Sequence, residues 1–402
     1  MNTKRAWYSQ LNTALAIRLT LGAAILATSV TVAHADSGVA GVKSIGLVLV
    51  TWKPANYEEG GNECPEGFHN TNQDNWRIQY PTEEQQAAYT KTYIHLAPTS
   101  AGGPIPLLFT QNRGPQGANV AYNPTSVQDP PVPEVQSKVS YGLNLDGTED
   151  GRATPNSCAH ETFESPTGEK GIDNQLFRLN GCWRGWRNDG FNTVYHSGQF
   201  ISSSLNRVLI NVTGVDDELN DDDVEVAIYK GIDGISLDTM GNPLPWHTQR
   251  IDTRFPRYMA QTRGRIVNGV LKTDPVDVRF GMYQMNSEGE RFIHGVRLDL
   301  KLSGTGAEGL LAGYEDLEQW WRGIRNSYMD VASNISYWSP PATYVALHRL
   351  ADGYPDPETG QCSAISSAYA ISAVRVYVTQ PKPDDPLVID PIVTQGIVQN
   401  SN

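Results

Sequence analysis

Alternating hydrophobic and polar residues recur along the chain and predict β-strands. The clearest case is residues 292–302, where Val296, Leu298 and Leu300 share one face and charged residues alternate with them. Residues 45–52 instead form a nearly continuous apolar run, which is typical of a strand that is covered on both faces. Further strands are predicted at residues 207–212, 224–229, 276–283 and 374–378, with a hairpin loop at 286–289.

Helical patterns are few. Residues 82–93 begin with Thr82 and Gln85 at the spacing of a capping box. Residues 314–326 place Leu317, Trp320 and Trp321 at helical spacing. Many strands with two short helices and long Pro/Gly-rich loops predict a mainly β protein, and we expect an antiparallel β-sandwich or jelly roll.

The first 35 residues have the features of a secretory signal peptide. Lys4 and Arg5 are positively charged, residues 19–32 are apolar, and Ala33 and Ala35 are the small residues of a cleavage site. The apolar stretch is too short to cross about 30 Å of hydrocarbon. We therefore expect a protein that is secreted or periplasmic after cleavage near Ala35, with no integral membrane insertion of the mature chain.

Composition changes divide the remaining chain. Residues 36–380 carry the strand signals and are predicted to form the β-sandwich-like domain. Within them, residues 97–136 are rich in Pro and Gly without periodicity, which predicts a long loop or linker. Residues 381–402 are predicted to be a Pro-rich C-terminal tail.

Charge and composition exclude some partners. The chain of 402 residues is 39% hydrophobic and 19% charged, which is a globular composition. Its formal net charge of −13 would repel the phosphates of nucleic acids, so we expect no nucleic-acid partner.

The chain has four cysteines, and this even number predicts two disulfides in an oxidising compartment. Three pairings are possible. We favour Cys158–Cys182, which closes a short loop worth about 3 kcal/mol in the chain-entropy model. Cys64–Cys362 would then join the two ends of the chain.

Residues 146–151 resemble the first half of an EF-hand-type calcium loop. Oxygen-bearing side chains fall at loop positions 1, 3 and 5, and glycine falls at position 6, where the turn is sharp. Ser157 stands at position 12, where such loops have Glu, and an ordinary Gly/Asp-rich turn is the alternative. We expect calcium as a structural ion, with ligands from Asp146, Thr148, Asp150, Arg152 (its carbonyl), Glu161 and Asp173.

Two indoles and two guanidinium groups lie together in residues 183–187 and suggest a ligand-binding surface. Sugars stack on exposed aromatic rings while Arg side chains bind their hydroxyls. The alternative is that the indoles cover the core around a disulfide, since large aromatic side chains are mostly buried. The candidate contact residues are Trp183, Arg184, Trp186 and Arg187.

Candidate acid/base residues lie nearby in the sequence. The acid/base candidates nearest the aromatic segment are His160, Glu161 and Asp173. His160 could also meet His196 in space as a metal-binding or acid/base pair. Ordinary hydrogen-bonding roles are the alternative for each of them.

These features predict an exported ligand-binding β protein that recognises glycan or another cell-surface polymer and carries structural calcium. A first alternative is a polysaccharide-acting hydrolase or lyase that uses paired carboxylates. A second alternative is a structural or assembly component of the cell envelope.

Overall fold

A computed structural model describes residues 43–68, 82–85, 87–88, 99–100, 103–104, 114–129, 131–284, 287–331, 339–382 and 385. Residues 42–402 form one compact unit. The predicted signal peptide lies outside the described residues, as do most of the predicted tail and much of the stretch 97–136. None of the helices in the described ranges is both long and apolar enough to span a membrane.

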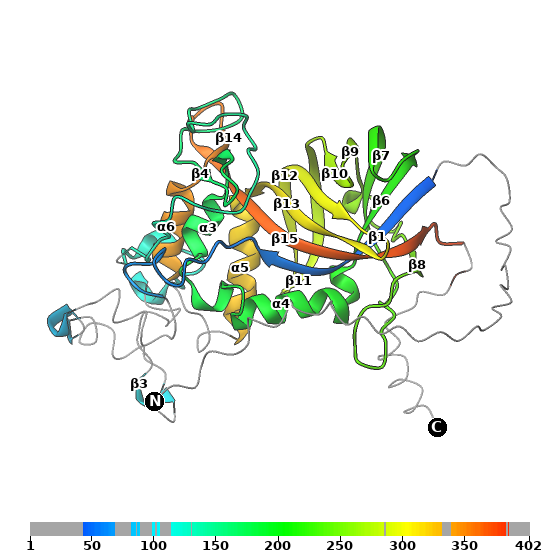
Figure 1. The fold of residues 1–402 in the computed structure, drawn as a ribbon. Helices are drawn as coiled ribbons and strands as arrows, with labels where there is room; N and C mark the ends of the chain where they lie inside the picture. Colours follow the sequence, from blue (N-terminus) through cyan, green and yellow to red (C-terminus); the bar gives the residue numbers. More distant parts are fainter. Residues whose placement is uncertain are drawn as a thin grey trace, which may run out of the picture. The chain divides into compact units, whose positions relative to one another are not determined.

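Eight antiparallel strands close into a barrel (Figure 1). The prediction of a mainly β fold with few helices is confirmed, but the strands do not form the expected sandwich or jelly roll. Alternating patterns predict strands with one covered face and do not specify how the sheet closes. In ring order the strands are β1 (Lys43–Pro54), β6 (Val208–Val215), β7 (Asn220–Lys230), β9 (Ala260–Val267), β10 (Val270–Thr273), β12 (Ser287–Leu302), β13 (Gly306–Asp316) and β15 (Cys362–Thr379).

The first and last strands of the ring complete it. β1 pairs with β6 on one side and with β15 on the other, so that Gly46 lies opposite both Asn211 and Val376. A Cβ atom at Gly46 would lie 2.3 Å from the Val376 carbonyl oxygen, so the missing side chain permits this close pairing. Figure 1 shows β1 and β15 running side by side.

Side chains fill the interior of the barrel. An eight-stranded barrel is just wide enough for inward-facing side chains to meet. The largest buried hydrophobic cluster contains inward residues from every strand of the ring, including Leu47, Ile210, Val226, Leu298 and Ile371. The barrel is therefore a packed core.

The remaining elements extend or cover the barrel. Strand β11 (Val276–Gln284) pairs with β12 in the predicted hairpin, but Gln284 pairs with Ser287, so the connection is tighter than expected. Helix α4 (Phe191–Ser202) packs on β1, α5 (Leu317–Val331) on β12, and α3 (Gln175–Asn180) on β15. Among the residues that the structure describes, the other labelled strands and helix are β2 (Thr99–Ser100), β3 (Gly103–Pro104), β4 (Phe163–Glu164), β5 (Lys170–Ile172), β8 (His247–Arg250), β14 (Gly353–Pro355) and α6 (Pro340–Arg349). Labelled 3₁₀ turns in the same residues lie at Pro115–Gly117, Pro124–Ser126, Arg184–Trp186, Ser204–Asn206 and Pro256–Tyr258.

Both predicted helical segments contain helical residues among those that the structure describes. Thr82 and Gln85 make the reciprocal backbone hydrogen bonds of a capping box, and the described residues that follow are helical. The second helix begins at Leu317, because Tyr314 and the two residues after it continue strand β13. Trp320 and Trp321 are buried in the core, as their spacing predicts.

The predicted disulfide pairing is wrong. The disulfides are Cys64–Cys182 and Cys158–Cys362, so each joins distant parts of the chain. Cys182 follows helix α3 and lies in a buried cluster with Cys64, while the backbone of Cys158 bonds to Asp352, close to β15. Loop length along the sequence does not reveal these contacts. Two disulfides indicate an oxidising environment.

Candidate metal centre

Four titratable side chains from separate segments meet beside the barrel. Asp146 lies in the predicted calcium loop, His160 follows Cys158, Asp173 follows β5, and Asp352 lies between α6 and β14. Ligand atoms of Asp146, His160 and Asp173 all lie within 4.8 Å of one another. Asp173 and Asp352 are fully buried, and the His160 side chain is only 5% exposed. We call these four residues the Asp/His centre.

Both ring nitrogens of His160 face oxygen atoms. Nδ1 lies 2.9 Å from the Cys158 carbonyl oxygen, so this nitrogen carries a proton and donates it. Nε2 lies 2.8 Å from Asp173 Oδ1 and 3.9 Å from Asp352 Oδ2. Carboxylate oxygens accept hydrogen bonds, so Nε2 needs either a second proton or a cation between it and the carboxylates.

Hydrogen bonds from neighbouring residues hold the carboxylates of Asp173 and Asp146 in place. Asp173 Oδ2 accepts hydrogen bonds from the backbone N–H groups of Leu145 (2.6 Å) and Asp146 (3.3 Å). Asp146 accepts from the Thr148 backbone N–H (2.7 Å) and the Ser157 hydroxyl (2.9 Å). These bonds tie the loop that carries Asp146 to Asp173.

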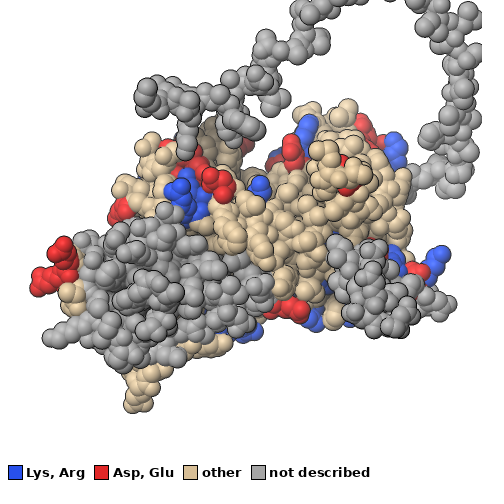
Figure 2. Space-filling model, turned by 90° about the horizontal axis from the view of Figure 1, so that it is seen from below, with Lys and Arg blue, Asp and Glu red and all other residues tan. Residues whose placement is uncertain are grey.

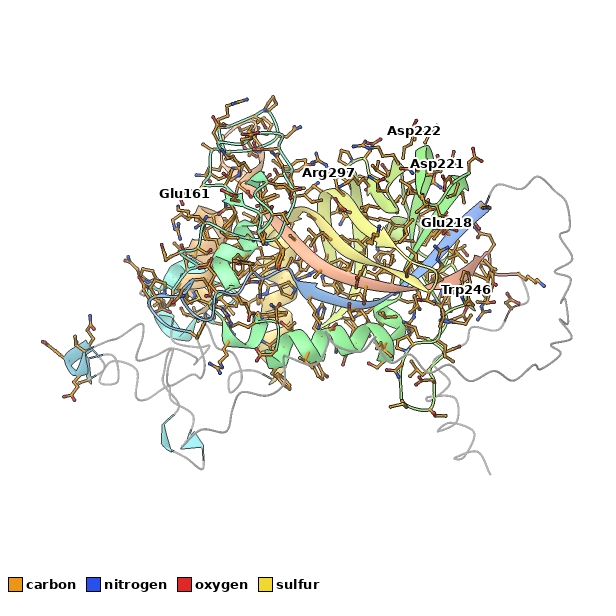
Figure 3. The ribbon with its side chains drawn as sticks, viewed as in Figure 1. Glu161, Glu218, Asp221, Asp222, Trp246 and Arg297 are labelled. Atoms are coloured by element: carbon orange, nitrogen blue, oxygen red, sulfur yellow. A yellow bond between two sulfur atoms is a disulfide. The ribbon has the colours of Figure 1, made fainter. Side chains whose placement is uncertain are left out.

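The sequence of this loop explains its close approach to His160. Gly151 has φ +66°, a conformation that glycine adopts without strain, and its carbonyl accepts the His160 N–H. A Cβ atom at Gly151 would lie 2.0 Å from the His160 carbonyl oxygen. Arg297 of β12 donates to the carbonyls of Asn144 (2.7 Å) and Leu145 (2.9 Å) and fastens the loop to the barrel wall (Figure 3).

Two buried oxygens at the centre lack hydrogen-bond partners among the described residues: Asp352 Oδ2 and the hydroxyl of Tyr314. Asp352 Oδ1 accepts from the Ser366 backbone N–H at 2.6 Å, so only one of its oxygens is satisfied. Because a buried unpaired oxygen is costly, Asp352 Oδ2 favours a nearby cation or proton, and the Tyr314 hydroxyl favours a partner for the proton that it already carries.

Burial and mutual charge shift the pKa values at the centre. Burial alone would lower the pKa of His160, but its hydrogen bond to Asp173 and the charge of Asp352 raise that pKa to about 9. Burial raises the pKa of Asp352 to about 7, against the opposing effects of His160 and Ser366. Burial and then the neighbouring carboxylates also raise the pKa of Tyr314. Burial is thus the main cause at Asp352 and Tyr314, whereas the hydrogen bond to Asp173 and the carboxylate charges raise the pKa of His160 against the effect of burial.

Other predicted ligands lie outside this centre. Asp150 is 64% exposed and pairs with Arg152, while Glu161 is 69% exposed and pairs with Lys138 at 2.8 Å (Figure 3). The Thr148 hydroxyl is buried without a hydrogen-bond partner among the described residues. The three predicted acid/base residues therefore do not lie together. Glu161 pairs with Lys138, whereas His160 and Asp173 contact each other.

The predicted aromatic surface does not exist as an exposed platform. Trp183 and Trp186 are 1% and 6% exposed and belong to the main hydrophobic core, as the alternative interpretation had it. Arg187 is buried and binds Glu63 at 2.5 Å, and of the four residues Arg184 alone is exposed. Stacking of a sugar on either indole would require the core to open.

Sequence reasoning missed Asp352 and separated His160 from the metal ligands. Asp352 stands in no motif, and its position depends on the pairing of Gly353 with Ala364 of β15. His196, the suggested partner of His160, lies instead on α4 between Trp186 and Phe200. The sequence pointed to the Asp146 loop and Asp173 as metal ligands and to His160 as an acid/base or metal-binding residue, but not to Asp352.

Comparison with known proteins gives no match: no family model, no curated protein and no solved structure is significantly similar to this chain. Conclusions about function therefore depend on the residues of the chain and their geometry.

Proposed function

We propose that this is an exported binding protein whose loops beside the barrel are held together by a divalent metal ion at Asp146, His160 and Asp173. The approach of His160 Nε2 to Asp173 Oδ1 supports this proposal most directly, because a metal ion bound by both atoms satisfies both. The Cys158 carbonyl fixes the other nitrogen in the way that is usual for metal-binding histidines.

The donor set favours a zinc-type ion. Imidazole nitrogen with carboxylate oxygens suits Zn²⁺, whereas Ca²⁺ takes oxygen ligands only. Asp352, whose Oδ2 lies 3.9 Å from His160 Nε2, is the candidate for a fourth ligand. The sequence-based expectation of calcium stays a prediction, and the same experiment tests it.

Burial supports a structural role over catalysis. Structural zinc sites have all positions filled by the protein, whereas catalytic sites keep one position open to substrate. The side chains of His160, Asp173 and Asp352 are at most 5% exposed. A polysaccharide cannot reach these groups, which weighs against the hydrolase or lyase alternative. The two disulfides support export.

The test is metal titration of protein freed of metal by chelation. We expect one Zn²⁺ per chain by calorimetry, with protons released as His160 binds the ion. At a hundredfold excess of free ion over Kd, the ion should stabilise the fold by about 2.7 kcal/mol. Ca²⁺ should give a smaller shift in the thermal melt.

Two variants serve as test and matched control. Asp173→Asn should abolish zinc binding, and Asp146→Asn repeats the test at a more exposed ligand. Asp277→Asn is the control, because Asp277 faces His294 at 3.3 Å in an exposed pair. Zinc binding that is absent in the wild type, or lost equally in the control, contradicts the proposal. Stabilisation by calcium alone would contradict the assignment to zinc.

A further inference from the structure

An exposed pair of aromatic rings lies at the end of strand β15, away from the Asp/His centre. Trp246 is 48% exposed and Tyr377 is 57% exposed. Their ring centroids are 5.8 Å apart and their planes are inclined at 43°. Ser366 of the same strand lies at the Asp/His centre, and Tyr377 follows it by eleven residues of extended chain, which span about 35 Å.

The backbone holds Trp246 in an unfavourable conformation. Its φ is +66°, a left-handed value that costs a bulky residue about 1–2 kcal/mol. The N–H of Trp246 donates to the Arg375 carbonyl at 2.6 Å, directly before β8 pairs in parallel with β15. The surrounding structure therefore fixes an indole at the surface at a cost in free energy.

An ion pair lies beside the indole. The guanidinium of Arg375 lies over the Trp246 ring at 5.8 Å and is bound by both carboxylate oxygens of Glu218 at 3.2 and 2.6 Å. The Arg375 side chain is 6% exposed, so its charge is neutralised and covered. Figure 3 shows Glu218 and Trp246 at the same end of the barrel. The rings thus form a rigid surface without a free charge beneath it.

The chemistry of this surface favours a neutral ligand with flat apolar faces. The net charge of −13 disfavours a second copy of the chain and anionic lipid or nucleic acid. In the described part of the face shown in Figure 2, acidic and basic side chains occur in small mixed groups around uncharged residues. The eight ring strands are each paired on both sides, and β8, which follows Trp246 and pairs only with β15, is four residues long and leaves little edge for an extended peptide.

We propose that Trp246 and Tyr377 form a binding platform for a neutral polysaccharide. Two inclined rings accept the apolar faces of successive sugar units, as aromatic side chains with polar edges do in binding sites. Tyr377 adds a hydroxyl group to this exposed face, and such a group can bind the hydroxyl groups of a sugar. Glycan recognition would then lie at Trp246 and Tyr377 instead of at Trp183 and Trp186. It would not require a metal at the Asp/His centre.

The experiment is affinity electrophoresis of the full chain in gels that contain dextran, xylan, laminarin or galactomannan. At least one of these neutral polymers should retard the wild type. Trp246→Gly should weaken binding at least about tenfold. Its melting temperature should equal or exceed that of the wild type, because glycine adopts the positive φ without strain. Tyr377→Ala should give a similar loss. Phe191→Ala, which removes an exposed ring on α4, is the matched control and should bind as the wild type does.

Several results would overturn the platform. These are no retardation by any neutral polymer, full binding by Trp246→Gly, or equal loss in the Phe191 control. Binding only to alginate or only to phosphatidylcholine vesicles would show a different class of ligand. Repeating the gels in EDTA separates the two proposals, since loss of metal should leave the retardation unchanged.

Discussion

Two buried polar clusters in this protein balance their charges differently. At one end of the barrel interior, Arg291 pairs with Glu315 at 3.6 Å, and the Tyr369 hydroxyl donates to the same carboxylate. One positive group thus faces one negative group. In the Asp/His centre, three carboxylates surround one imidazole, so negative charge is in excess.

The histidines beside the two clusters respond in opposite directions. Burial, and then the charge of Arg291, lower the pKa of His196 to about 3, so this imidazole stays neutral. The carboxylates around His160 instead raise its pKa to about 9. The comparison teaches that the balanced cluster needs no added ion, whereas the Asp/His centre needs a proton or a metal ion.

The largest expected effect comes from unbalancing the first cluster. Arg291→Met leaves the Glu315 carboxylate buried without its cation and should lower the free energy of unfolding by about 3–5 kcal/mol. Arg291→Met with Glu315→Gln should recover most of this loss, because no charge is then buried. Urea unfolding measures the stability of both variants. If Arg291→Met alone is as stable as the wild type, the pair is not charged.

Removing each disulfide in turn tests whether one of them supports metal binding as well as stability. The Cys158→Ala/Cys362→Ala variant should lose about 2–4 kcal/mol of stability, and it should also bind zinc more weakly because the Cys158 carbonyl orients His160. Cys64→Ala/Cys182→Ala is the control, with a similar loss of stability but unchanged zinc affinity. Equal zinc affinity in both variants would show that Cys158 does not position the imidazole.

The sequence predicts local features of the fold well and long-range pairing poorly. Strands such as 45–52 and 276–283 could be predicted because alternation and apolar runs are local. Closure of the barrel depends on β1 meeting β15, more than 300 residues later, at a contact that Gly46 permits. The same limit explains the wrong cysteine pairing.

The candidate site was predicted in part for the same reason. Asp146 carries a loop signal because oxygen-bearing side chains and Gly151 follow it at the spacing of a calcium loop, and Gly151 does adopt a positive φ. Asp352 carries none, because only the fold brings it to His160. Whether the indoles of Trp183 and Trp186 are buried could not be predicted from the sequence, because buried and exposed aromatic residues look alike beside a cysteine.

The pH dependence of stability sharpens the comparison. His160 has a pKa raised from 6.5 to about 9, so its contribution is complete below pH 6.5 and is lost as pH rises through 9. The Asp352 contribution is complete below pH 3.8 and is lost as pH rises through about 7. Metal-free protein should therefore lose on the order of 2 kcal/mol of stability between pH 6.5 and 9.

Urea unfolding across this pH range, with and without zinc, measures that loss. His160→Gln should flatten the profile in the same range. Zinc should reduce the slope, because the ion replaces the imidazolium proton. A metal-free wild type whose stability is constant or increases from pH 6.5 to 9 would contradict the excess of negative charge at the centre.

The smallest expected effects test the calcium loop that the sequence predicts against the centre that the structure forms. Asp150 and Glu161 are predicted ligands, yet both are exposed and paired with Arg152 and Lys138. Exposed ion pairs of this kind contribute little, so Asp150→Asn and Glu161→Gln should each change stability by less than about 0.5 kcal/mol. Neither variant should alter the affinity for zinc, whereas Asp146→Asn in the same loop should reduce it. A strong loss of metal affinity in Asp150→Asn would show that the ion follows the EF-hand-like order of residues 146–151, because Asp150 can become a ligand only if it leaves Arg152 and turns inward.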